Sequence, residues 1–246
     1  MKPRICILQT DGTNCDDETA QAVRLANGEP VTVHINRFRS RKLKLTDFQG
    51  LILAGGFSYG DDVASGKILA IELLSFLGDQ VRELVARQRP ILGICNGFQV
   101  LVRMGLLPYP ELGRMQATMA HNDSGHFQCQ WVTLEPAKVT PCVFLRGVDR
   151  PFELQMANGE GRYKTDAGTL ERMQRDGLVA LHYAENPNGS QDAIAGVCDP
   201  TGTIFGLMPH PERFVYVTQH PNWRRESHEP RGLSIFLNGV AYAAQL

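Results

Sequence analysis

Residues 90–107 read PILGICNGFQVLVRMGLL, and this stretch decides the fold that the rest of the chain has to fit. Its first part, PILGIC (90–95), is a short apolar run typical of a buried strand. Its second part, GFQVLVRMGLL (97–107), spaces its apolar residues as a helix does. A buried strand that passes directly into a helix favours a parallel sheet, because parallel strands need a crossover connection that is usually helical.

The residues before this stretch repeat the same alternation. Apolar runs at 5–9, 31–35 and 51–56 predict three more strands, and helices are expected at 16–27 and 66–88. Alternation of this kind indicates a parallel sheet that helices cover on both faces.

The residues after Pro108 have a different pattern. A hairpin is predicted over 193–209, because Asp199-Pro200-Thr201-Gly202 is a turn sequence between two apolar runs. Further strands are expected at 127–135, 141–145, 152–156 and 179–185, and helices at 169–177 and 232–246. We therefore predict one domain over 1–246, an α/β fold with a mostly parallel central sheet and a more antiparallel second half.

The composition excludes several classes of protein. With 43% hydrophobic and 21% charged residues, the chain is not disordered. A net charge of −1 gives no basic excess for binding nucleic acid. No apolar stretch reaches the roughly 18 residues of a membrane span. The six cysteines form no CxxC pair, which predicts reduced thiols and a cytoplasmic location.

Two polar stretches, 37–44 and 218–231, interrupt the predicted elements. Both are typical of solvated surface. Since long loops in compact domains often carry function, a docking or lid element is the alternative.

Gly93-Ile94-Cys95-Asn96-Gly97 lies where the strand meets the helix. This is the arrangement of a nucleophile elbow, with a cysteine as the nucleophile. The glycines leave room for a strained turn. The helix N-terminus favours the thiolate, and the amide of Asn96 is placed to hold an oxyanion. The alternative is a buried structural cysteine in a tight turn.

A thiol nucleophile needs a base, and His210 is the best candidate of the seven histidines. It follows an apolar strand, so it is expected at the same sheet edge as Cys95. Glu212 lies two residues on, so both side chains can point the same way from an extended backbone. His121 and His126 could suggest a metal site, but no further ligand completes the set, and no metal is expected.

A glycine cluster, GGFSYGDD (55–62), follows another predicted strand. It does not fit the phosphate-loop pattern, and the chain has no GxGxxG. Backbone amides at Gly55 and Gly56 therefore predict half of an oxyanion hole. An ordinary tight turn is the alternative.

Taken together, these motifs resemble the class I glutamine amidotransferases, and more closely the glutaminases of phosphoribosylformylglycinamidine synthase. The likeness extends over nearly the whole chain. It rests on GGFSYGD (55–61), LGICNGFQVL (92–101), ANGEGRY (157–163), NPNGSQDAIAG (186–196) and GLMPHPER (206–213).

The resemblance implies a glutaminase with a Cys95, His210 and Glu212 triad. Cys95 would attack glutamine, His210 would move protons, and Glu212 would orient His210. The amides of Gly56 and Asn96 would hold the oxyanion. The substrate-binding positions that it implies are Gln99 and the segment Asn158-Gly159-Glu160.

The resemblance also implies partners. Ammonia would pass to a separate synthetase chain that binds ATP and magnesium, joined by a small third subunit, so no cofactor is expected in this chain. Relatives often carry His where Asn158 stands, and many continue GGFSYGD with Tyr-Leu-Arg where this chain has Asp62-Val63-Ala64.

Three other functions fit parts of the sequence. The first is a thiol hydrolase or amidase that acts alone. The second is a glutaminase of another biosynthetic pathway, such as nucleotide or tryptophan synthesis. The third is an inactive regulatory subunit, although all three triad residues are present.

Overall fold

A nine-stranded sheet forms the centre of the computed structural model, which describes residues 1–226 and 228–246. Its strand order is β2-β1-β3-β4-β11-β10-β9-β6-β7. The strands from β2 to β11 pair in parallel, and each pairing from β11 to β7 is antiparallel. The predicted parallel first half and more antiparallel second half are confirmed.

The strands of this sheet are β1 (Arg4–Gln9), β2 (Glu29–His34), β3 (Gly50–Leu53), β4 (Ile91–Ile94), β6 (Gln128–Pro136), β7 (Phe152–Asn158), β9 (Val179–Tyr183), β10 (Ile194–Cys198) and β11 (Ile204–Leu207). Two further strands, β5 (Ala117–Ala120) and β8 (Arg162–Thr165), form a separate antiparallel pair. Every residue of β3, β4, β10 and β11 is buried, which is why these strands read as continuous apolar runs.

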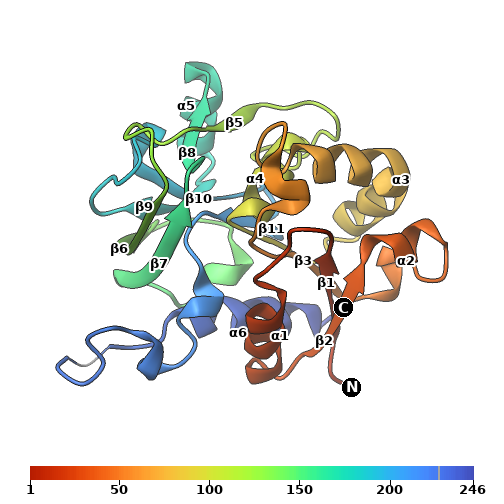
Figure 1. Cartoon of the computed structure of the whole chain (residues 1–246), viewed down its shortest axis with the longest axis horizontal. Coiled ribbons are helices and arrows are strands. Elements are labelled where there is room, and N and C mark those ends of the chain that lie inside the picture. The colour runs from red at the N-terminus through yellow and green to blue at the C-terminus, as the bar shows by residue number, and fades with distance from the viewer. Residues whose placement is uncertain (227) are drawn as a thin grey trace.

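The helices cover both faces of the sheet, as the sequence predicts. They are α1 (Asp16–Leu25), α2 (Ile35–Arg39), α3 (Lys67–Ala86), α4 (Asn96–Arg103), α5 (Ala167–Arg175) and α6 (Gly232–Ala243). In Figure 1, α1 and α6 pack together on one side of the parallel strands, and α3 and α4 pack together on the other. No helix in the described parts of the chain is long and apolar enough to span a membrane.

Two expectations about local structure are wrong. The strand expected at 141–145 is a 3₁₀ turn, Val143–Leu145, whose apolar side chains are buried beneath α6. The helix expected over 97–107 ends at Arg103, because Gly105 adopts a positive φ of 74° and the N–H of Leu106 returns to the carbonyl of Leu101. This is the hydrogen bond of a Schellman cap.

The 218–231 stretch is anchored to β7 where the structure describes it; Ser227 lies outside the described residues. Glu153 of β7 lies 3.5 Å from His220 Nε2 and 3.1 Å from His228 Nδ1. His220 is buried, so this stretch is partly packed and not only solvated surface. The 37–44 stretch forms the end of α2 and the exposed turn after it.

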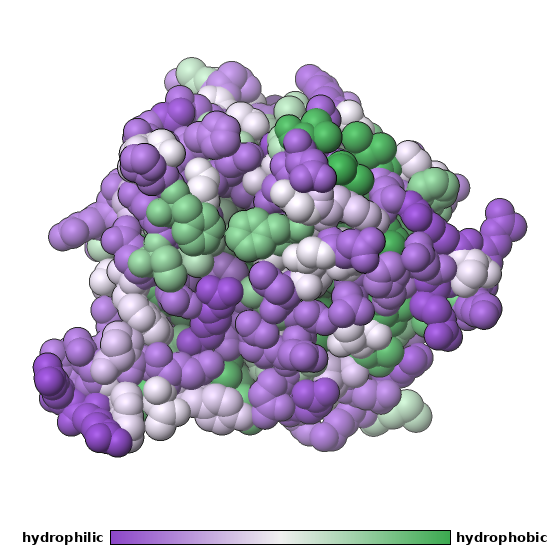
Figure 2. All heavy atoms as spheres, viewed as in Figure 1, coloured by the Kyte–Doolittle hydropathy of each residue, from purple (hydrophilic) through white to green (hydrophobic). Residues whose placement is uncertain are grey.

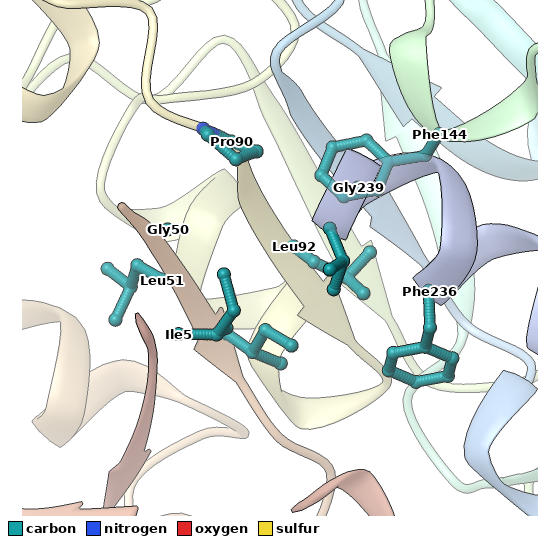
Figure 3. Close-up of a pocket in the computed structure, with 10 residues that line it drawn as sticks. Ile5, Gly50, Leu51, Pro90, Leu92, Phe144, Phe236 and Gly239 are labelled. Carbon is teal, nitrogen blue, oxygen red and sulfur yellow. The ribbon is translucent and has the colours of Figure 1, made fainter. Parts of the chain in front are cut away.

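A small apolar gap lies at the amino ends of the parallel strands, beneath α6 (Figure 3). It is lined by Ile5, Leu92, Phe144 and Phe236. Its volume of about 20 Å³ leaves room for little more than one water molecule. A gap of this size and polarity is a packing defect and offers no place for a ligand. The functional site lies at the opposite, carboxyl ends of these strands.

Gly97 tests how tightly α4 packs on the sheet. A Cβ on Gly97 would lie 1.9 Å from the carbonyl oxygen of Leu53, so Gly97→Ala should lower the free energy of unfolding by about 3 kcal/mol or more. Gly78 in α3 is the control, because its Cβ would meet only the end of Arg82, at 3.7 Å. Gly78→Ala should raise stability by roughly 0.5–1 kcal/mol. Urea unfolding measures both, and equal stability of Gly97→Ala and the wild type would contradict this packing.

Candidate active site

Cys95 occupies the turn between β4 and α4, as the sequence predicts. Its backbone has φ 50° and ψ −105°, a region that non-glycine residues rarely adopt. The flanking glycines make this possible: a Cβ on Gly93 would lie 2.7 Å from the carbonyl oxygen of Gly97. Strain of this kind costs about 1–3 kcal/mol and persists at functional sites where the surrounding packing enforces it.

The helix that follows Cys95 contributes to the electrostatics of the thiol. Asn96 is the first residue of α4, so its backbone N–H has no acceptor within the helix. The N-terminal end of a helix carries partial positive charge. The helix N-terminus therefore stabilises negative charge near Cys95, including the charge on an oxyanion that forms when the sulfur attacks a carbonyl.

His210 lies just beyond β11 and pairs with Glu212. Its Nδ1 is 2.6 Å from Glu212 Oε1, and the two residues are 2% and 0% exposed. An extended backbone is expected between them from the sequence, but Pro211–Arg213 forms a 3₁₀ turn instead. The turn still places both side chains together. A hydrogen bond from the N–H of His210 to the carbonyl of Gln155, 2.8 Å long, attaches this segment to β7.

The surroundings of His210 favour its protonated form. Burial alone lowers the pKa of the imidazole, but the carboxylate of Glu212 and the sulfur of Cys95 outweigh it and raise that pKa well above its ordinary value. Cys95 and His210 line the same cavity. His210 therefore contacts Glu212 with Nδ1 and shares the cavity with the Cys95 thiol.

A cavity of about 430 Å³ opens over these side chains. Six of the predicted site residues line it, namely Cys95, His210, Gly56, Gln99, Asn158 and Gly159. Glu212, Gly55 and Asn96 lie behind its wall. The structure therefore brings the predicted residues together around one space large enough for an amino acid.

Gly55 and Asn96 support the site from behind. A Cβ on Gly55 would lie 2.8 Å from His210 Cε1, so this glycine leaves room for the imidazole. The side chain of Asn96 accepts a hydrogen bond from the N–H of Ser58 and donates to Asp61 and Gln99. It thereby joins the glycine-rich 55–62 segment to α4.

Gln99 and Asn158 differ in how their amides are used. Gln99 accepts from Asn96 at 3.0 Å and donates to the carbonyl of Glu160 at 2.8 Å, so it holds two parts of the cavity wall together. Asn158 is 3% exposed, and neither side-chain atom of its amide has a hydrogen-bond partner within the described residues. Buried amides without partners are uncommon.

Sequence reasoning missed a second thiol at this site. Cys15 is 1% exposed, accepts a hydrogen bond from Arg213 at 3.2 Å and donates to Asn14. It also lies beside His210, although it does not line the cavity. Arg213 was available as a signal, because it belongs to the same PHPER segment as His210 and Glu212.

Charged and aromatic residues complete the cavity. Asp61, His121 and Arg213 line it and are not predicted as site residues, and Glu160, from the segment that the resemblance implies, lines it too. Phe57 and Phe127, 47% and 54% exposed, also line it, with ring centroids 6.3 Å apart. Apolar side chains gather near the middle of the face seen in Figure 2, with polar ones around them.

Two groups of side chains place possible metal ligands within reach of one another: Cys15, His210 and Glu212, and Glu153, His220 and His228. In the first group the ligand atoms already have protein partners, because Arg213 donates to the sulfur and the imidazole is bonded to the carboxylate. The second group anchors the 218–231 stretch. That the chain needs no metal stays a prediction.

Replacing Glu212 tests the electrostatics of His210. Glu212→Gln keeps the size of the side chain but removes the negative charge, so the pKa of His210 should fall and the ring should lose its proton at lower pH. Nuclear magnetic resonance titration of the imidazoles measures this change. Glu153→Gln is the control, because the ion pairs of Glu153 among the described residues are with His220 and His228 and not with His210. An unchanged titration of His210 in Glu212→Gln would contradict the pairing.

Comparison with known proteins places the chain among glutamine amidotransferases. A family model described as a CobB/CobQ-like glutamine amidotransferase domain matches residues 2–243. The chain is 41% identical to a phosphoribosylformylglycinamidine synthase subunit PurQ of Dehalococcoides mccartyi, over 100% of this chain and 99% of that one. It is 38% identical to the PurQ of Thermotoga maritima, over 87% of this chain and 90% of that one.

Solved structures agree. A chain in the structure of PurLQS from Thermotoga maritima superposes with a TM-score of 0.80 and 33% identity, covering 98% of this chain and 99% of that one. Another glutamine amidotransferase of Thermotoga maritima, 16% identical, superposes with a TM-score of 0.56 over 98% of this chain and 97% of that one, and shares the fold. The chain belongs to the CobB/CobQ-like glutamine amidotransferase family, within the group of PurQ subunits.

Proposed function

We propose that the chain is the glutaminase subunit of phosphoribosylformylglycinamidine synthase. It hydrolyses glutamine to glutamate and supplies the ammonia to an ATP-dependent synthetase. The synthetase converts formylglycinamide ribonucleotide to formylglycinamidine ribonucleotide in purine biosynthesis. The observation that carries this proposal is the buried His210–Glu212 pair, whose imidazole lines the same cavity as the Cys95 thiol, in a chain that matches PurQ proteins from end to end.

The first half of the proposed reaction breaks the amide bond of glutamine. The Cys95 sulfur, whose proton already resides on His210, attacks the side-chain carbonyl carbon as a thiolate. The backbone amides of Gly56 and Asn96 hold the oxyanion. His210 then gives the proton to the departing nitrogen, and ammonia leaves a glutamyl thioester on Cys95.

The second half releases glutamate. A water molecule gives a proton to His210 and attacks the thioester carbonyl, and the carbon–sulfur bond breaks as the proton returns to the sulfur. Glu212 stabilises the imidazolium in both halves of the reaction. The rise that its carboxylate causes in the pKa of His210 supports this role. The nucleophile needs no metal ion, because the helix N-terminus and His210 supply the activation.

Partners and location follow from the proposed function. The synthetase chain would bind ATP and magnesium, and a small third subunit would join the two. The structure of PurLQS from Thermotoga maritima, in which the matching chain is found, supports such an assembly. The six cysteines are free thiols, which fits the expected cytoplasmic location.

Activity of the complex with two nitrogen sources tests the proposal. Cys95→Ala should lower glutamine-dependent conversion of formylglycinamide ribonucleotide at least about 1000-fold, because it removes the nucleophile. The same complex should still work with ammonium, since the synthetase is intact. Cys198→Ala is the matched control, because Cys198 is a buried thiol of β10 that does not line the cavity.

Other outcomes identify the alternatives. Use of glutamine by Cys95→Ala would make Cys95 structural and the chain a regulatory subunit. A wild-type complex that works with ammonium but not with glutamine would assign the glutaminase to another pathway. Full glutamine turnover by the isolated chain, with no transfer to the synthetase, would indicate an amidase that acts alone.

A further inference from the structure

Two networks of side chains border the cavity. One contains His210, Arg213 and Cys15. The other contains Asp61, Asn96, Gln99 and Glu160, joined by the hydrogen bonds of Asn96 and Gln99. The first is rich in positive charge, and the second presents two carboxylates to the cavity.

The geometry of the proposed reaction decides which network faces the amino acid end of glutamine. The attacked carbon has four substituents: sulfur, the oxyanion, the departing nitrogen and the side chain of the substrate. The nitrogen must face His210, which protonates it, and the oxyanion must face the backbone amides. The side chain therefore leads away from His210, and Asp61 belongs to the network that does not contain His210.

Asp61 is placed to receive a cation there. It is half-buried and lines the cavity. The N–H of Gly66 and the side-chain amide of Asn96 both donate to the same oxygen, Oδ1, at 3.1 Å. These bonds fix the orientation of the carboxylate and leave Oδ2 for a ligand.

The charge of this network is unbalanced without a ligand. Burial raises the pKa of Asp61, and the negative charge of Glu160 adds to that effect. Arg103 lies 3.8 Å from Glu160 but does not line the cavity, so it does not neutralise Asp61 directly. Glu160 already pairs with Arg103, and among the described residues Asp61 has no cationic side chain as an ion-pair partner. A ligand with a positive charge would therefore compensate Asp61.

We propose that Asp61 binds the α-ammonium group of glutamine and selects amino acids over amides that lack it. This inference rests on the proposed function, because it assigns the orientation of the same substrate. Glu160 reinforces the negative potential around Asp61. The side-chain amide of Gln99 holds Glu160 in place by donating to its backbone carbonyl. Asp61 is thus a specificity residue that takes no part in proton transfer.

The test compares two substrates in the complete synthase complex. One is L-glutamine, and the other is 4-carbamoylbutanoate, which is glutamine without the α-amino group. Asp61→Asn should lower kcat/KM for glutamine by about 10- to 100-fold, the value of one charge-assisted hydrogen bond, with most of the change in KM. It should leave kcat/KM for 4-carbamoylbutanoate almost unchanged, so the preference for glutamine should collapse.

The controls separate binding from folding and from the proposed function. Asp62→Asn alters the exposed neighbour of Asp61 and should behave as the wild type. Reaction with ammonium should be unaffected in every variant, which shows that the complex assembles. Asp61→Ser also removes the carboxylate. It replaces Asp61→Asn in the same comparison if the Asp61→Asn chain does not assemble into the complex.

An equal loss with both substrates would overturn the inference, because Asp61 would then only support Asn96. No loss with glutamine would overturn it as well. If the wild-type complex used ammonium but no glutamine at all, the proposed function would fail first, and this outcome is distinct from the other two.

Discussion

The contact between α4 and the carboxyl end of β3 is the constraint on which the site depends. Gly97 lies so close to the carbonyl of Leu53 that no side chain fits between them, and Gly93 packs against Gly97 in the same way. Because the helix begins so close to the sheet, Cys95 is held in a strained conformation. The burial of every residue from 96 to 102 offsets that strain. The result is a thiol that lines the cavity with a helix N-terminus behind it.

The second constraint is that two thiols share one imidazole. A ligand atom of His210 lies within 4.8 Å of the Cys15 sulfur, and Cys95 lines the same cavity as His210. Both sulfurs raise the pKa of His210. Their surroundings differ. Cys15 accepts from Arg213 and donates to Asn14, and it does not line the cavity. Cys95 has the cavity before it, and its other contact is weak, 3.6 Å to the carbonyl of Ala157. The position of the cavity therefore favours Cys95 as the nucleophile, and Cys15 with Arg213 forms part of the support for His210.

Local sequence patterns predict much of this arrangement and fail where tertiary contacts decide. The parallel strands are fully buried, so their apolar runs identify them, and turn residues identify the hairpin of β10 and β11. The 141–145 segment is also apolar, but it is buried as a 3₁₀ turn, and apolarity alone cannot distinguish the two. The meeting of Cys95 and His210 follows from their places at neighbouring strand ends. Asp61 belongs to the glycine cluster that is expected at the site, although no role is predicted for its side chain. Cys15 comes from another loop, and only the folded chain shows that it lies beside His210.

The most direct test of the account is to identify the thiol that carries the glutamyl group during turnover. The synthase complex, mixed with glutamine and quenched in acid within the first turnovers, is digested, and the modified peptide is found by mass spectrometry. The account predicts a glutamyl thioester on the peptide that contains Cys95, and none when Cys95→Ala replaces the wild type. A glutamyl group on Cys15, or one that forms equally in Cys95→Ala, would contradict it.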